Sequence, residues 1–202
     1  MSLRRKASRA RRDALASSAR NSYHPWMSVE IVRRDAGKEF PGRKLKKIAQ
    51  KLLALVGQHE AELSLALVGN SEIQTLNAKY RKKDYPTDVL AFPVDDRLGT
   101  EERLLGDVVI SVQKAKQQAK QGRRSLDEEM AALLIHGVLH LLGYDHERSS
   151  PDARIMRGLE KRIYRQLCDE GMLEYNSVQV QRTRRGRPRD EIIKCWKKPP
   201  NN

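Results

Sequence analysis

Residues 125–146 have the sequence SLDEEMAALLIHGVLHLLGYDH, which begins with a helix start signal and continues as an apolar run. Ser125 and Glu128 have the spacing of a capping box, in which the hydroxyl and the carboxylate each accept a hydrogen bond from the other residue's backbone amide. The apolar positions that follow cover most of the helix circumference, and a helix that is apolar on all sides is a buried one. The stretch therefore predicts a buried helix in the core of the domain.

Three of the five histidines of the chain lie near the end of this helix, at His136, His140 and His146. Because four residues turn a helix by about 400° and advance it by about 6 Å, the first two imidazoles project from the same face. Gly143 can adopt the left-handed conformation that ends a helix, and the returning chain would bring His146 to the same point. Three imidazoles with a fourth position open form the ligand set of a catalytic zinc site. We therefore predict one Zn²⁺ per chain, although nickel, copper or iron would also suit imidazoles.

Two alternatives compete with a catalytic zinc site. The histidines could be core or helix-capping residues with ordinary hydrogen bonds, but burying three imidazoles without partners would be costly. The spacing also matches the metzincin protease pattern, His-Glu-x-x-His-x-x-Gly-x-x-His, except at Gly137, where the protease has its general base. A zinc protease would therefore need Asp145 or Glu147 as a substitute base. The pattern favours a metal platform without the usual peptidase chemistry.

The other predicted elements are short strands mixed with helices. Apolar spacing and turn signals predict strands at residues 29–32, 61–68, 89–92 and 105–111, and helices at residues 45–56, 70–80 and 112–121. This order lacks the regular alternation of a doubly wound sheet, so the predicted fold class is α+β, a small mixed β-sheet covered mainly on one face by several helices. The length of 202 residues suits a single domain, which we place at residues 28–177.

Most of the net charge of +14 lies in two basic tails. Residues 1–27 and 178–202 contribute +6 each, which leaves +2 for residues 28–177, so the charge alone does not indicate a basic fold. Both tails are predicted to be disordered. The Arg- and Ser-rich N-terminal tail could instead be an organellar targeting segment, with Met27 as an alternative start. The C-terminal sequence RTRRGRPRD resembles an AT-hook, but an RNA-binding or simply solubilising basic tail is the simpler interpretation.

The cysteines and the apolar stretches bear on the compartment. Cys168 and Cys195 form no CxxC pattern, which predicts free thiols in a reducing compartment. The longest apolar stretch, residues 130–142, contains two histidines and is shorter than the roughly 20 residues that a membrane span needs. We therefore expect no membrane contact and a cytoplasmic location, with import into an organelle as the alternative.

Three segments of the chain, in this order, resemble the YbeY family of endoribonucleases. They are LNAKYRKKDYPTDVLAFP at residues 76–93, LGDVVIS at residues 105–111 and HGVLHLLGYDH at residues 136–146. The resemblance covers roughly residues 28–172. It implies a zinc-dependent enzyme in which the three histidines hold the ion, His136 and Arg81 take part in catalysis, and Arg81 also binds the substrate beside the metal. Arginine suits that role because its fixed fork of donors matches phosphate oxygens.

Three smaller features lie in or beside these segments. The chain departs from the family at Ala91, where the family usually has serine, so any contact made by that hydroxyl is missing here. Thr87 and Asp88 have the composition of a turn in which a side chain hydrogen-bonds the backbone. Asp107 is a candidate for the carboxylate that holds a ligand histidine in place.

The resemblance implies a single-strand-specific, metal-dependent endoribonuclease that acts in rRNA maturation, including 16S-type 3′ end processing, and in ribosome quality control. Its partners would be single-stranded rRNA, the small ribosomal subunit, a small-subunit ribosomal protein and an Era-type GTPase. The alternative is a non-catalytic ribosome-assembly factor that binds RNA and carries structural zinc. A protein ligand at the fourth metal position, such as Asp145 or Glu147, would favour that alternative. A zinc metalloprotease without the usual base is the third hypothesis.

Overall fold

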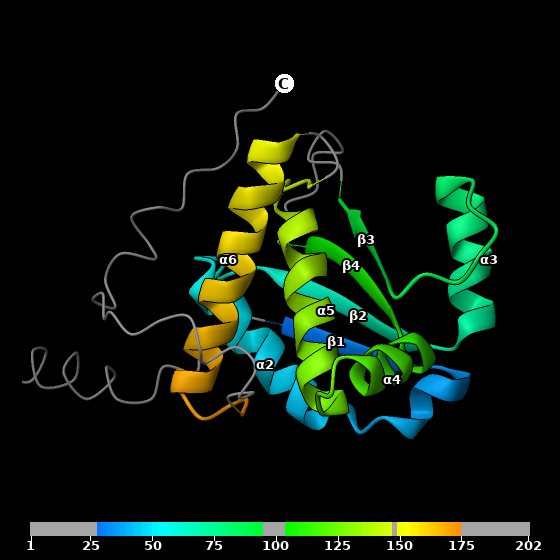
Figure 1. Ribbon diagram of the computed structural model, residues 1–202, viewed down its shortest axis with the longest axis horizontal. Helices are drawn as coiled ribbons and strands as arrows, with labels where there is room; N and C mark the ends of the chain where they lie inside the picture. The colour runs from blue at the N-terminus through cyan, green and yellow to red at the C-terminus, as the bar shows by residue number, and fades with distance from the viewer. Residues whose placement is uncertain (1–27, 95–103, 147–148, 175–202) are drawn as a thin grey trace, which may run out of the picture.

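The computed structural model describes residues 28–94, 104–146 and 149–174, which form a four-stranded sheet with helices packed against it (Figure 1). The strand order is β1-β2-β4-β3; β1, β2 and β4 are parallel, and β3 is antiparallel to β4. The strands are β1 (Ser28–Arg33), β2 (Glu62–Val68), β3 (Val89–Pro93) and β4 (Leu104–Ser111). The predicted α+β class with a small mixed sheet is confirmed.

Five α-helices and a 3-10 helix accompany the sheet in the described part of the chain. They are η2 (Asp35–Glu39), α2 (Gly42–Leu55), α3 (Asn70–Arg81), α4 (Val112–Gln121), α5 (Leu126–Leu141) and α6 (Ser150–Asp169). The elements predicted from the sequence omit α6, although its signals are present. The Ser149 hydroxyl accepts a hydrogen bond from the amide of Asp152, proline stands in the first turn, and apolar residues recur at helical spacing.

The helix α5 is the centre of the main core. The predicted capping box is present, since the Ser125 amide donates to Glu128 Oε2 over 2.7 Å and the Glu128 amide donates to Ser125 Oγ over 3.2 Å. The helix packs against β3 and β4 on one side and against α2, α4 and α6 on others (Figure 1). Its buried residues include Met130, Leu134 and Val138, which are fully inaccessible.

The opposite face of the sheet carries a smaller apolar cluster. Val68, Leu90 and Val109 point to this face, because they alternate along their strands with residues of the main core. Ile73 of α3 packs on them. The main core therefore lies on one face, as predicted, and α3 is the helix that covers part of the other. This places the end of α3 beside the outer strand β3.

A close approach between α5 and the sheet depends on Gly137. A Cβ atom at this position would lie 2.8 Å from Val108 Cγ1 and 3.3 Å from Val89 Cγ2. These methyl groups are one bond from their Cβ atoms and cannot move aside without shifting the strands. Glycine at this position therefore lets the helix lie directly on β3 and β4, and it sets the height of the neighbouring histidines above the sheet.

Several predictions made from the sequence fall on residues outside the described ranges. These are the two basic tails, the targeting alternative for residues 1–27, Cys195 and Glu147. Cys168 is a free thiol in the structure, and burial raises its pKa to about 11. Among the helices of the described ranges, none combines the length and the apolar character that crossing a bilayer requires.

The contact at Gly137 predicts a stability difference between two glycine substitutions. Gly137→Ala gains about 1 kcal/mol in helix propensity but overpacks the contact with Val108, at a cost of about 1–3 kcal/mol, so we expect a net loss. Gly158→Ala in α6 is the matched control, because no atom lies within 4 Å of its added Cβ. It should raise the free energy of unfolding by about 0.5–1 kcal/mol. Urea denaturation of both variants measures the difference, and equal stabilisation would contradict this account of the packing.

Candidate metal centre

The three predicted histidines meet because α5 ends in a tight reversal. Gly143 has φ +86°. The Tyr144 amide donates to the carbonyl of Leu139 over 3.0 Å and the Gly143 amide to that of His140 over 2.9 Å, which is the Schellman pattern of a helix end. The left-handed residue turns the chain back across the end of the helix. His146 therefore approaches the face from which the two helical histidines project.

The ring nitrogens of these histidines converge on one point. One nitrogen from each of His136, His140 and His146 lies within 4.8 Å of the others. The Nε2 atoms of His136 and His140 are 3.1 Å apart, and the three ring centroids are separated by 4.6, 5.1 and 5.3 Å. The helical pair is half-buried and His146 is exposed. Within the described ranges, this is the group of side chains whose donor atoms are placed to hold a metal ion.

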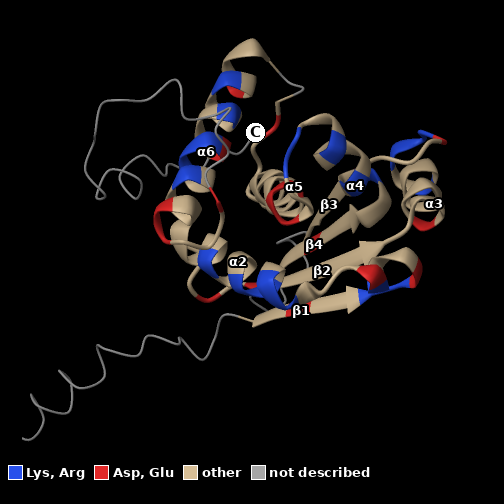
Figure 2. Cartoon of the chain, turned by 60° about the horizontal axis from the view of Figure 1, so that its bottom comes forward, with Lys and Arg blue, Asp and Glu red and all other residues tan. Residues whose placement is uncertain are grey.

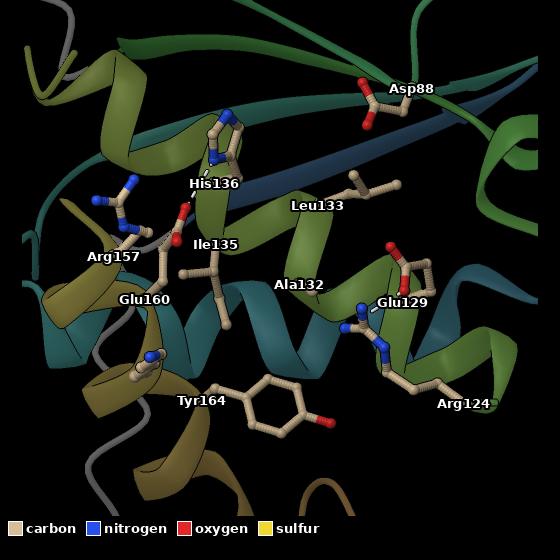
Figure 3. A pocket seen from close by; sticks show the side chains of 11 residues that line it. Asp88, Arg124, Glu129, Ala132, Leu133, Ile135, His136, Arg157, Glu160 and Tyr164 are labelled. Atoms are coloured by element: carbon tan, nitrogen blue, oxygen red, sulfur yellow. Dashed lines mark hydrogen bonds and ion pairs between the residues drawn. The ribbon is translucent and has the colours of Figure 1, made fainter. Parts of the chain in front are cut away.

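A carboxylate from α6 fixes one of the rings. His136 Nδ1 lies 2.7 Å from Glu160 Oε1, and this contact is visible in Figure 3. An ionised carboxylate accepts a hydrogen bond, so Nδ1 carries the proton and donates it to Glu160. The lone pair is then on Nε2, which is the nitrogen that faces His140. Carboxylate–histidine contacts of this kind orient metal ligands and raise their basicity.

The environment of His140 favours its neutral form. Burial lowers the pKa of His140, and the nearby His136 and His146 lower it further. The charge of Asp145 and a hydrogen bond with the backbone of Tyr144 oppose this shift without reversing it. Because an imidazole binds a metal ion only when it is deprotonated, a lowered pKa keeps this ring ready to bind at neutral pH.

The histidines line a cavity of about 780 Å³ together with the outer strand and the end of α3. Arg81 is the last residue of α3, and Lys82 follows it in the left-handed conformation with φ +60°. Asn77 Nδ2 donates to the carbonyl of Tyr85 over 2.8 Å, which ties the following loop to the helix. This loop leads into β3. The structure thus brings Arg81 to the cavity of the histidines, 55 residues before the first of them.

Asp88 lies at the junction between the loop and β3. Its carboxylate accepts hydrogen bonds from the Val89 amide, at 2.9 Å, and from Gln118 Nε2, at 2.8 Å. Burial by itself would raise the pKa of Asp88, but these hydrogen bonds and one from Thr87 leave it below its usual value. The predicted side-chain contact with the turn backbone is therefore present. Asp88 remains an ionised anchor of the strand.

Two expectations about smaller features have different outcomes. Ala91, where the resembled family usually has serine, does line the cavity. The expectation for Asp107 is wrong, because the carboxylate that holds His136 is Glu160, while Asp107 is exposed on β4. The sequence reasoning missed Glu160 because its helix was not predicted and because the two partners are 24 residues apart. One signal was available: a histidine that binds a metal usually donates its other ring N–H to an acceptor such as a carboxylate, so an acidic partner could be expected.

The fold and the site define an α+β protein with a three-histidine centre in an open cavity. A family model described as endoribonuclease YbeY matches residues 30–168. A Sulfurihydrogenibium protein named endoribonuclease YbeY is 46% identical over 144 residues, which cover 71% of this chain and 92% of the relative. An Aquifex aeolicus protein of the same name is 41% identical over 139 residues, or 69% of this chain and 89% of the relative. The chain belongs to the YbeY family.

A solved structure has a similar fold. The solution structure of a Thermotoga maritima protein matches this fold with a TM-score of 0.51 and 28% sequence identity. The match covers 71% of this chain and 91% of that protein. The resemblance carried by the three sequence segments is therefore confirmed at the level of the whole domain.

The contact between Glu160 and His136 predicts a measurable effect on metal affinity. Glu160→Gln keeps a hydrogen-bond acceptor but removes the charge, so we expect affinity for Zn²⁺ to fall about 10–100-fold. Glu72→Gln on α3 is the control, because its carboxylate pairs with Arg34 at the surface. Competition with a chromophoric chelator measures both affinities. Unchanged affinity in Glu160→Gln would show that the contact does not support the centre.

Proposed function

We propose that this protein is a zinc-dependent endoribonuclease that cleaves single-stranded RNA at the His136, His140 and His146 centre. The observation that carries the proposal is the placement of three imidazole nitrogens and Arg81 in one cavity of a YbeY-family domain. The proposed process is rRNA maturation, including 16S-type 3′ end processing, and ribosome quality control in the cytoplasm.

The donor set fits zinc. Four-coordinate zinc has Zn–N distances of about 2.0–2.1 Å, which place two ligand nitrogens about 3.3–3.4 Å apart. The two helical Nε2 atoms are 3.1 Å apart, which is close to that separation. Three neutral nitrogen ligands with a fourth position left for water or substrate are typical of catalytic rather than structural zinc. When bound, such an ion supplies a Lewis acid for a phosphoryl oxygen and lowers the pKa of a coordinated water.

The roles of the side chains follow from their positions. His136 and His140 present their nitrogens from consecutive turns of α5, and Glu160 holds the first ring in one orientation. Arg81 lines the same cavity from the end of α3, and there its guanidinium can hold the scissile phosphate and stabilise the extra negative charge of the transition state. In phosphoryl transfer the protein contributes mainly by positioning the reacting groups and stabilising charge. The histidines, Glu160 and Arg81 together can do both.

A second candidate function is a ribosome-assembly factor in which zinc is structural. Asp145 favours this candidate, because it lines the same cavity and its charge acts on His140. A structural site would need such a side chain to complete the coordination. However, the donor atoms that converge in the described ranges come from the three histidines and do not include Asp145. This difference supports the catalytic function.

The peptidase alternative meets a steric obstacle. The protease pattern requires glutamate at position 137, but this position lies against Val108 and Val89 of the sheet, where even a Cβ has no room. A general base on this turn of α5 therefore cannot be accommodated in this packing. The packing of α5 supports a nuclease over a protease.

Substitutions in the cavity should separate catalysis from folding. We expect His136→Ala to abolish cleavage of a single-stranded RNA, and Arg81→Ala to slow it about 10²–10³-fold, as for the loss of a charge-stabilising donor. The matched controls are His59→Ala and Lys79→Ala, which remove the same residue types, or a similar charge, outside the cavity. Gel analysis of the products and circular dichroism provide the measurements. Full activity in either cavity variant, with the fold intact, would overturn the mechanism.

Metal removal distinguishes the two candidate functions. For the endoribonuclease, dialysis against a chelator should abolish cleavage while the far-UV spectrum persists, and added Zn²⁺ should restore the activity. Removal of a structural ion would instead unfold the protein, because the binding energy of such an ion is folding energy.

The ends of the cleavage products identify the nucleophile, since a 2′,3′-cyclic phosphate indicates attack by the neighbouring RNA hydroxyl. Binding to small ribosomal subunits, to a small-subunit ribosomal protein and to an Era-type GTPase tests the proposed partners.

A further inference from the structure

We propose that the exposed basic face of α6 binds the phosphate backbone of the RNA strand as it leaves the histidine centre. The inference rests on the proposed function and extends the substrate contact beyond the histidine cavity. We use the name α6 stripe for Arg154, Arg157, Lys161 and Arg165, all of which are exposed. The spacing of three, four and four residues places these side chains on one side of the helix. Figure 2 shows the basic residues along α6.

The α6 stripe begins at the metal centre. A cavity of about 340 Å³ between α5 and α6 is lined by Arg157 and Lys161 and also by His136 and Glu160. In Figure 3, Arg157 lies beside Glu160 at the end of this cavity where His136 stands. His136 thus contributes to two cavities, one shared with Arg81 and one shared with the stripe. A strand with a phosphate at the histidines would have these two basic flanks on either side.

The two flanks lie on opposite sides of α5. Figure 1 shows α3, which ends at Arg81, beyond the outer strand on one side of α5, and α6 on the other. A single-stranded RNA that crosses the end of α5 would therefore contact Arg81 before the centre and Arg157 after it. From Arg154 to Arg165 the helix rises about 16 Å, which is long enough for several nucleotides of an extended strand.

Three charges of the stripe, those of Arg154, Arg157 and Lys161, are available for an external partner. The three carboxylates of the cavity are engaged elsewhere: Asp88 by Gln118, Glu129 by Arg124 at 3.4 Å, and Glu160 by His136. Arg154, Arg157 and Lys161 make no ion pair with any residue of the ranges 28–94, 104–146 and 149–174. Proteins that bind single-stranded nucleic acids use a track of positive charge of this kind to follow the backbone.

An RNA backbone suits this surface better than an acidic protein does. A protein partner would not require the charges to begin at a ligand histidine, whereas a substrate strand must pass through that point. Residues 28–177 have a net charge of only +2, so the line of positive charge on α6 is a local feature of the domain. The basic residues follow one line along α6, and that line is continuous with the cavity of His136. A polymer with evenly spaced phosphates accounts for both features.

The salt dependence of RNA binding tests the proposal. The α6 variant combines Arg154→Gln, Arg157→Gln and Lys161→Gln, and the control combines Arg43→Gln, Lys46→Gln and Lys47→Gln on the exposed face of α2. Both remove three positive charges and keep good helix formers. The probe is a fluorescein-labelled, single-stranded 2′-O-methyl oligoribonucleotide, titrated with zinc-loaded full-length protein from about 50 to about 200 mM salt.

Each contact to a single strand contributes about 0.7 to the slope of log affinity against log salt concentration, so the α6 variant should lose about 2 from the slope of the unsubstituted protein. The α2 control should keep that slope. An unchanged slope in the α6 variant would overturn the proposal and leave the stripe to solvent or to an acidic protein. An equal loss in both variants would also overturn it, because the effect would then be one of overall charge.

Two further outcomes keep the test decisive. If the triple α6 variant does not fold, Arg157→Gln alone replaces it, with an expected loss of about 0.7 in slope. Failure of the proposed function is separately visible. If the unsubstituted protein does not cleave RNA but the α6 variant loses salt-dependent slope, the α6 contact is retained and the proposed nuclease is refuted. If the unsubstituted protein cleaves RNA and the α6 variant keeps the full slope, the nuclease is retained and the α6 contact is refuted.

Discussion

The structure depends on a conflict within α5, which must be buried on nearly all sides and yet present two imidazoles to an open cavity. The conflict is resolved by the side of the helix that the histidines occupy. The first turns, around Met130 and Leu134, are enclosed by neighbouring helices and the sheet. At Gly137 the helix lies against β3 and β4 without an intervening side chain. In the last turns Val138 and Leu139 are still fully buried, and the helix is more accessible on the side of His136 and His140, which are half-buried. A rigid backbone lets two side chains keep a fixed separation.

The three parts of the site reach the cavity by different routes. The histidines are local, because one helix and one reversal at Gly143 place all three. Arg81 and Glu160 are not, because they come from helices that precede and follow α5 in the chain: α3, which packs on the sheet, and α6, which packs on α5. The centre thus receives its donors from one element and its orientation and charge from two others. Such an arrangement couples the site to the packing of α3 and α6, so a change far from the histidines can alter the geometry without touching a ligand.

The same distinction explains how much of the molecule could be predicted from the sequence. The capping box at Ser125, the spacing of the histidines and the role of Gly143 in turning the chain are local features, and each has the geometry that the spacing predicted. The fold class also followed from the order of short strands and helices. The contact of Glu160 with His136 could not be found in this way, since nothing local links residues 24 apart. The close contact of Gly137 with Val108 likewise depends on how the helix crosses the sheet, which periodicity does not specify.

The net charge of the domain says little about where its charged side chains lie. Residues 28–177 have a net charge near zero. This sum does not show that acidic and basic side chains lie in different parts of the domain and have different roles. Buried Glu128 accepts hydrogen bonds from the Ser125 amide and the Tyr164 hydroxyl, and Asp88 anchors a strand end. These acids are used inside the fold, where an unpaired carboxylate would be costly. Positive charges, in contrast, remain at the surface on the end of α3 and along α6. A nearly neutral domain can therefore offer a basic path to a polyanion, because the acids beside that path, such as Glu160 and Asp88, are engaged in hydrogen bonds within the fold.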